Sequence, residues 1–108
     1  MYSKHERLLK EFRLCIDEKR YYDAHEAIEE IWFPRRFEKN DEVLLLKGFI
    51  NAAVCFELIK LQREKPSKTA WLTYLKYRPL LYKVKSPYLN DYHQLSRLLE
   101  RLKNEKKV

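Results

Sequence analysis

The segment from Glu42 to about Arg63 constrains the fold of this 108-residue chain more than any other. Its run VLLLKGFINAAVCFELIKL is apolar on nearly every side of a helix, and Asn40 or Asp41 can cap its start. We therefore expect a central helix that other helices cover. Gly48 costs that helix about 1 kcal/mol relative to alanine, which a close helix crossing would justify. One glycine and four prolines in the whole chain argue against a sheet-rich fold with many tight turns.

Four further helices are predicted around this central one. Apolar residues recur at helical spacing in the remaining segments, and capping residues or prolines bound them. The predicted helices cover residues 3–19, 22–33, 66–78 and 88–105, with a loop over residues 34–40 and a further turn over residues 80–82. The fold class is therefore all-α, a compact bundle of about five helices in one domain over residues 1–108. A chain of this length buries enough apolar surface to fold without a disulfide or a structural zinc.

The segment YYDAHEAIEEIW, residues 21–32, contains the most informative polar pattern. At about 100° per residue, His25, Glu29 and Trp32 fall in one narrow sector of a helix, beside its apolar stripe. A histidine and a carboxylate at this border need partners, because a buried polar group is costly without a hydrogen bond. The pair is therefore either a ligand or metal site, or a polar contact that ties two helices together.

The same segment, followed by LLLKGFINAAVCFE and KTAWLTYL, resembles the prokaryotic domain-of-unknown-function family 309 over about residues 20–82. The family pattern is roughly Y-x-x-A-H-E-x-x-E-x-x-W, then a G-[LIV]-I-Q-x-A-A helix that ends in a histidine. Asn51 stands where glutamine is common, and Glu57 stands where the family usually has its second histidine. The resemblance implies a small all-helical fold with no established activity. The candidate polar cluster consists of His25, Glu26, Glu29, Trp32, Asn51 and Glu57.

Two interpretations of His25, Glu29 and Glu57 stay open. In the first, His25 and Glu29 at i and i+4 bind a divalent transition metal, and Glu57 or Asn51 from the central helix completes the ligand set. In the second, which we favour, His25 hydrogen-bonds Glu29 or a residue of the central helix, in a polar contact that ties two helices together. Folding requires no metal in either interpretation.

A hydrolase-type activity is an alternative, because His25 with Glu26 and Glu29 can supply general acid–base chemistry. The sequence has no matching nucleophile motif, and Cys55 lies in an apolar helix, where a thiolate is disfavoured. No phosphate-binding or dinucleotide-binding fingerprint is present either. We therefore expect a non-catalytic binding or structural module.

Charge divides the chain into two unlike halves. Residues 1–59 hold ten Lys and Arg against twelve Asp and Glu, whereas residues 60–108 hold thirteen against four. Aromatic residues alternate with the basic ones in the second half, a pattern that suits phosphate contacts and base stacking. Nucleic acid is thus an alternative partner, although a solvated basic face is the interpretation we prefer. The candidate anion-binding residues are Arg35, Arg36, Lys76, Arg78, Lys83 and Lys85.

Three features of the sequence bear on location and assembly. The longest apolar stretch is too short to span a bilayer, and residues 1–12 lack the apolar core of a secretory signal. The two cysteines lack the spacing of a metal-binding motif, and we expect both to be buried, reduced thiols. We therefore expect a cytoplasmic protein with no membrane partner, and the apolar central helix also allows a homodimer seam.

Overall fold

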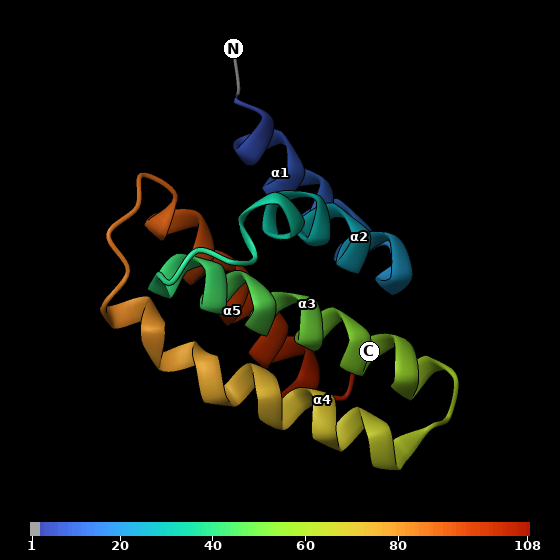
Figure 1. Cartoon of the computed structure of the whole chain (residues 1–108). Helices are drawn as coiled ribbons and strands as arrows, with labels where there is room; N and C mark the ends of the chain where they lie inside the picture. The colour runs from blue at the N-terminus through green and yellow to red at the C-terminus, as the bar shows by residue number, and fades with distance from the viewer. Residues whose placement is uncertain (1–2) are drawn as a thin grey trace.

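Helices account for nearly all of the regular structure in the computed structural model, which describes residues 3–108 (Figure 1). The elements are α1 (Lys4–Asp17), α2 (Tyr21–Trp32), η1 (Phe33–Arg35), α3 (Asp41–Lys60), α4 (Glu64–Tyr77), η2 (Arg78–Tyr82) and α5 (Leu89–Asn104), where η marks a 3-10 helix. No strand occurs within this described range. The all-α bundle of five α-helices predicted from sequence is confirmed.

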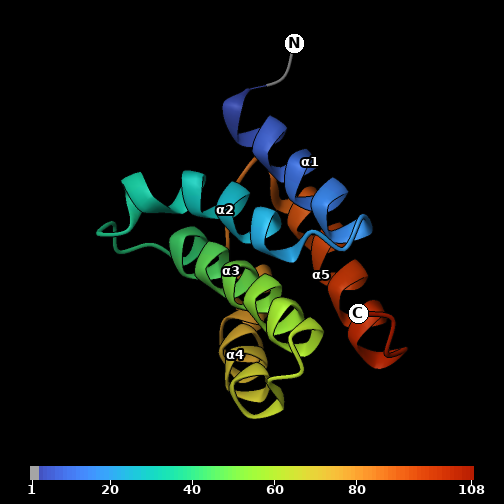
Figure 2. The same cartoon turned by 90° about the vertical axis from the view of Figure 1, so that its right-hand side faces the viewer.

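Helix α3 lies at the centre of the bundle. Helix α2 packs across one side of it and α4 along another, while α1 packs on α2 (Figures 1 and 2). Its buried residues cover most of the helix circumference, as its apolar pattern predicts, and leave outward only the side that carries Leu44 and Lys47. They are Val43, Leu45, Leu46, Gly48, Phe49, Ala52, Ala53, Cys55 and Phe56.

Gly48 sits where α3 and α4 cross. A Cβ atom added at this position would lie 3.1 Å from Cβ of Tyr77 and 3.7 Å from the carbonyl oxygen of Tyr74. The first distance is shorter than most contacts between side-chain carbons. A glycine therefore lets the two backbones approach closely, as expected for a glycine placed in mid-helix.

Side-chain caps fix the start of two helices as predicted. The Ser3 hydroxyl accepts a hydrogen bond from the Glu6 amide at 3.1 Å, and the Asn40 side-chain oxygen accepts one from the Val43 amide at 3.0 Å. Each cap satisfies a backbone donor that has no partner inside its helix.

Several boundaries differ from the predicted ones, and three of the differences have a local explanation. Helix α4 begins at Glu64 instead of Pro66, because proline is tolerated in the first helical turn, where its missing N–H is not needed. Helix α3 ends at Lys60, since Gln62 adopts a left-handed backbone with φ of 60° that stops the helix. Residues 33–35, predicted to lie mostly in a loop, continue α2 as a 3-10 turn.

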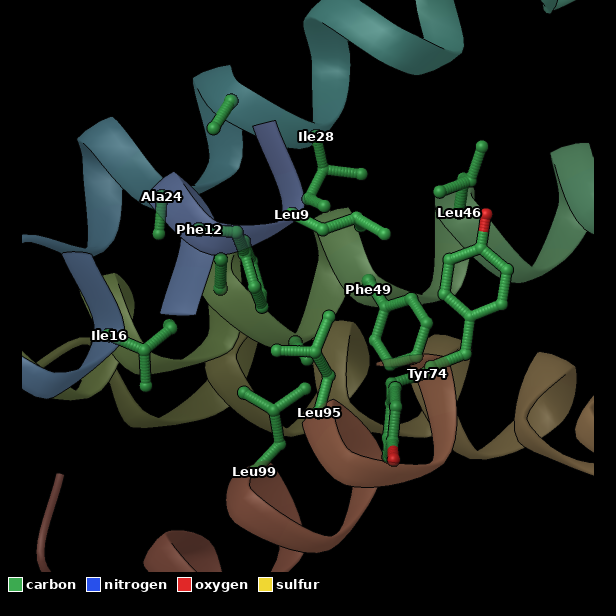
Figure 3. Packing of buried hydrophobic residues seen from close by; sticks show 14 of the residues in the cluster. Leu9, Phe12, Ile16, Ala24, Ile28, Leu46, Phe49, Tyr74, Leu95 and Leu99 are labelled. Carbon is green, nitrogen blue, oxygen red and sulfur yellow. The ribbon is translucent and has the colours of Figure 1, made fainter. Parts of the chain in front are cut away.

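All five helices contribute to one hydrophobic core. Figure 3 shows Phe12 of α1, Ile28 of α2, Phe49 of α3, Tyr74 of α4 and Leu95 of α5 directed toward one another. The two cysteines are buried and free, as the sequence predicts. Among the described residues, no helix has the length and apolar character needed to cross a membrane.

Candidate functional site

A small pocket of about 220 Å³ lies between α2 and α3. Binding sites for drug-sized molecules typically span about 300–1,000 Å³, so this pocket suits a smaller ligand or group. We call it the α2–α3 pocket. Its lining consists of Tyr21, Tyr22, His25, Val54, Glu57 and Leu58.

His25 is held in one orientation by its own helix. It pairs with Glu29, as one form of the favoured interpretation has it, but the polar partners of its ring within residues 3–108 belong to α2, so it does not tie α2 to α3. Its Nδ1 donates a hydrogen bond to the carbonyl oxygen of Tyr22 at 2.6 Å, and the two rings lie 4.9 Å apart. A carbonyl oxygen only accepts, so Nδ1 carries a proton. The other nitrogen, Nε2, lies 3.2 Å from a carboxylate oxygen of Glu29. In its neutral form the ring therefore presents Nε2 as an acceptor, and in its charged form it pairs with Glu29.

Tyr21 contributes a buried hydroxyl to the site. Only 1% of the residue is exposed, and its ring packs edge-on against Phe56 with centroids 5.4 Å apart. The hydroxyl has no hydrogen-bond partner within residues 3–108. Burial raises the pKa of Tyr21, and the nearby Glu57 carboxylate raises it further. Tyr21 and Glu57 both line the α2–α3 pocket, and no hydrogen bond joins the Tyr21 hydroxyl to Glu57.

Glu57 is half-buried on the α3 side of the pocket. Throughout the described part of the chain its carboxylate has neither a hydrogen-bond partner nor an ion-pair partner. The cation one turn along α3, Lys60, instead donates to the backbone carbonyl of Lys19 at 3.2 Å. The pocket therefore presents a carboxylate that no cation in its lining compensates.

The other members of the predicted cluster are placed elsewhere. Glu26 is exposed and lines a different hollow, between α1 and α2. Trp32 is half-buried against the core, with its ring 6.5 Å from that of Phe33. The Asn51 side chain donates to the Lys47 carbonyl of its own helix at 2.9 Å. Only His25 and Glu57 line the α2–α3 pocket, with Glu29 joined to it through His25.

A three-ligand metal site does not fit these positions. Within residues 3–108, no group of three or more His, Cys, Asp or Glu side chains is arranged to hold a metal ion. His25 and Glu29 form a pair, and Glu57 reaches the pocket from the opposite helix without joining that pair. The arrangement favours a small, mostly apolar binding pocket with one carboxylate residue in its lining over a metal centre.

Sequence reasoning missed Tyr21 as a site residue. A tyrosine at the start of an amphipathic helix looks like an ordinary core residue, and its ring is indeed buried. The one available signal is that Tyr21 occupies the tyrosine that opens the family pattern. Its unsatisfied hydroxyl depends on how α2 crosses α3, which no local pattern encodes.

A second polar cluster surrounds Glu42 at the start of α3. Its carboxylate accepts hydrogen bonds from Arg35 at 2.9 Å, from the Ser86 hydroxyl at 2.6 Å and from the Tyr92 hydroxyl at 2.7 Å. Burial acts to raise the pKa of Glu42, but these three hydrogen bonds outweigh it and lower that pKa. His5 of α1 bonds to Tyr92 at 2.8 Å and extends the cluster. The cluster joins α1, η1, α3 and α5 and has a structural role.

The predicted anion-binding residues split into two groups. Arg35, Lys83 and Lys85 line a shared hollow of about 360 Å³, but Asp41 and Glu42 line it too. These two carboxylates offset much of the positive charge that would attract a phosphate.

The other three basic residues interact with neighbouring side chains or backbone groups. Arg36 donates to the Phe33 carbonyl at 2.6 Å, Arg78 pairs with Glu100, and the Lys76 ammonium lies 5.3 Å from the centre of the Tyr77 ring. Nucleic-acid binding through these residues stays a prediction that the geometry does not favour.

Comparison with known proteins identifies one family. The model of the family described as "domain of unknown function (DUF309)" matches residues 9–72. None of the curated proteins and none of the solved structures matches the chain. The matched region contains both helices that form the α2–α3 pocket.

Proposed function

This chain belongs to the domain-of-unknown-function family 309, and from that premise we propose that it is a non-catalytic binding module whose ligand occupies the α2–α3 pocket. One observation carries the proposal. The hydroxyl of Tyr21, which shares the pocket lining with Glu57, is buried, and no partner within residues 3–108 satisfies it. Such an unpaired group costs about 1–3 kcal/mol. A ligand that bonds to the hydroxyl would offset that cost.

The other buried hydroxyl groups within residues 3–108 are satisfied. The Ser67 hydroxyl donates to the Glu64 carbonyl at 2.5 Å, and the Ser96 hydroxyl bonds to Tyr74 at 2.6 Å. Among the buried side-chain polar atoms of the described residues, the Tyr21 oxygen is the exception. An exception of this kind in a folded protein calls for a functional explanation.

A catalytic role has less support. Burial raises the pKa of the Cys55 thiol to about 11, so this thiol stays protonated and unreactive near neutral pH. His25 is oriented by Tyr22 and Glu29, but no serine, threonine or cysteine shares the lining of its pocket. The pocket therefore suits recognition better than nucleophilic chemistry.

The test is a two-dimensional NMR titration of isotope-labelled protein with benzylamine, benzyl alcohol and benzoate. These probes share a benzene ring and differ in the polar group, which is an ammonium, a hydroxyl or a carboxylate. We expect at least one to cause saturable shifts confined to residues 21–25 and 54–58. Tyr21→Phe should weaken that binding, whereas Tyr82→Phe should not, because Tyr82 is 74% exposed and lies outside the pocket. If no probe binds there, the proposal is wrong.

We also propose a cytoplasmic location. Both cysteines are buried free thiols, and cysteines of this kind are typical of proteins from reducing compartments. Fractionation of cells that produce the protein tests this point, and recovery outside the cytoplasmic fraction would contradict it.

A further inference from the structure

We propose that the α2–α3 pocket selects a small organic cation, namely a primary ammonium group on a short apolar body. This inference deepens the proposed function and depends on it. It rests on the charge of the pocket, on its hydrogen-bonding groups and on the character of its walls.

Charge is the first argument. The side chains that line the pocket include one carboxylate, Glu57, and no lysine or arginine. The Glu29 carboxylate, 3.2 Å from Nε2 of His25, adds a second negative charge next to this lining residue. Lys60, the nearest cation along α3, is directed to the Lys19 carbonyl. A cationic ligand would meet attraction in this pocket, whereas an anionic ligand would meet repulsion.

Hydrogen bonding is the second argument. A primary ammonium group has three N–H donors and no acceptor. The lining residues carry three acceptor oxygens, two on the Glu57 carboxylate and one on the Tyr21 hydroxyl, which is covered in the ligand-free protein and would be uncovered on binding. An ammonium bound at this end would accept no hydrogen bond and could donate three. One ammonium group would thus supply both an ion-pair partner for the Glu57 carboxylate and a hydrogen-bond donor for the Tyr21 hydroxyl.

The walls give the third argument. Val54 and Leu58 on α3 and the ring of Tyr22 on α2 form the apolar part of the lining. They suit a short hydrocarbon or a single ring, and the volume of about 220 Å³ limits the length of that body. An aromatic ring beside the site also attracts a cation through its π face. The expected ligand is thus a small amine, not a nucleotide or a peptide.

The test compares dissociation constants for benzylamine, benzyl alcohol and benzoate at neutral pH, from the same NMR titration. We expect benzylamine to bind at least about tenfold more tightly than benzyl alcohol, because hydrogen bonds to a charged group are the stronger ones. Benzoate should bind most weakly. Equal or tighter binding of the alcohol or of benzoate would overturn the ammonium inference and leave the pocket as a binding site. Absence of binding by all three would overturn both proposals.

Two variants locate the source of the preference. Glu57→Gln removes the pocket carboxylate. It should reduce the preference for benzylamine over benzyl alcohol about tenfold and leave the binding of benzyl alcohol unchanged. Glu26→Gln removes one negative charge from α2, outside the pocket. The dissociation constants of benzylamine and benzyl alcohol should therefore stay within about twofold of those of the unsubstituted protein. Equal effects of the two variants would show that general charge, not the pocket, attracts the amine. Retained alcohol binding in Glu57→Gln shows that the pocket is folded.

Discussion

Tyr21 and Tyr74 bury their rings equally well but differ at the hydroxyl. The Tyr74 hydroxyl bonds to Ser96 at 2.6 Å and to Glu100 at 2.9 Å, whereas the Tyr21 hydroxyl bonds to no group within residues 3–108. The two tyrosines are therefore a matched pair. Removing a satisfied hydroxyl loses hydrogen bonds, and removing an unsatisfied one relieves a desolvation cost.

Tyr21→Phe should raise the free energy of unfolding of the ligand-free protein by about 1 kcal/mol, and Tyr74→Phe should lower it by about 1–2 kcal/mol. Urea unfolding followed by circular dichroism measures both. A loss of stability in Tyr21→Phe as large as that in Tyr74→Phe would mean that the Tyr21 hydroxyl is satisfied after all.

At the level of helices, the α3–α4 crossing depends on Gly48. Alanine would gain about 1 kcal/mol in helix propensity, but its Cβ would lie 3.1 Å from Cβ of Tyr77, close to the α4 backbone. Overpacking of this kind costs about 1–3 kcal/mol. Gly48→Ala should therefore lower the free energy of unfolding by up to about 2 kcal/mol, measured by urea unfolding. A more stable variant would show that α4 can shift without cost.

The sequence predicted which segments form helices better than it predicted where the helices begin and which side chains meet between them. Helix α3 was predictable because apolar residues surround its axis, and only a buried central helix tolerates that pattern. The start of α4 was not, because a proline that ends one helix can equally occupy the first turn of the next. His25 and Glu57 were found as polar residues on apolar helices. Their separation from Glu26, Trp32 and Asn51 depends on the crossing of α2 over α3, which is a tertiary property.

Across the whole molecule, the Glu42 cluster joins segments that are far apart in sequence. Arg35, Ser86 and Tyr92 all reach one carboxylate. No local sequence pattern predicts this hydrogen bond, since Glu42 and Tyr92 are fifty positions apart. Arg35 also bonds to Glu38, which is far more exposed.

Glu42→Ala should therefore lower the free energy of unfolding by about 3 kcal/mol, because it leaves a half-buried arginine and two hydroxyl groups without their acceptor. Glu38→Ala removes a surface partner of the same Arg35 and should cost less than about 1 kcal/mol. Thermal unfolding of the two variants compares them directly. Similar losses would show that the Glu42 cluster does not hold the bundle together.

The same cluster should make stability depend on pH. Burial lowers the pKa of His5 below its ordinary value of 6.5, with Glu42 opposing and Arg35 adding to the shift. The unfolded chain then takes up a proton before the folded protein does, so stability falls as pH drops below about 6.5. The lowered pKa of Glu42 adds a further loss at and below about pH 4.5, where that carboxylate is protonated in the unfolded chain first.

Urea unfolding between pH 7.5 and 5 should show this decline, and His5→Gln should flatten it. A decline of the same size in His5→Gln would assign it to other groups.

The most direct measurement of the central claim is a crystal structure of the protein with benzylamine bound. The account predicts an ammonium nitrogen within hydrogen-bonding distance of the Tyr21 hydroxyl and of the Glu57 carboxylate, with the ring against Val54 and Leu58. A structure in which the amine lies elsewhere, and a water molecule alone satisfies the Tyr21 hydroxyl, would contradict the account.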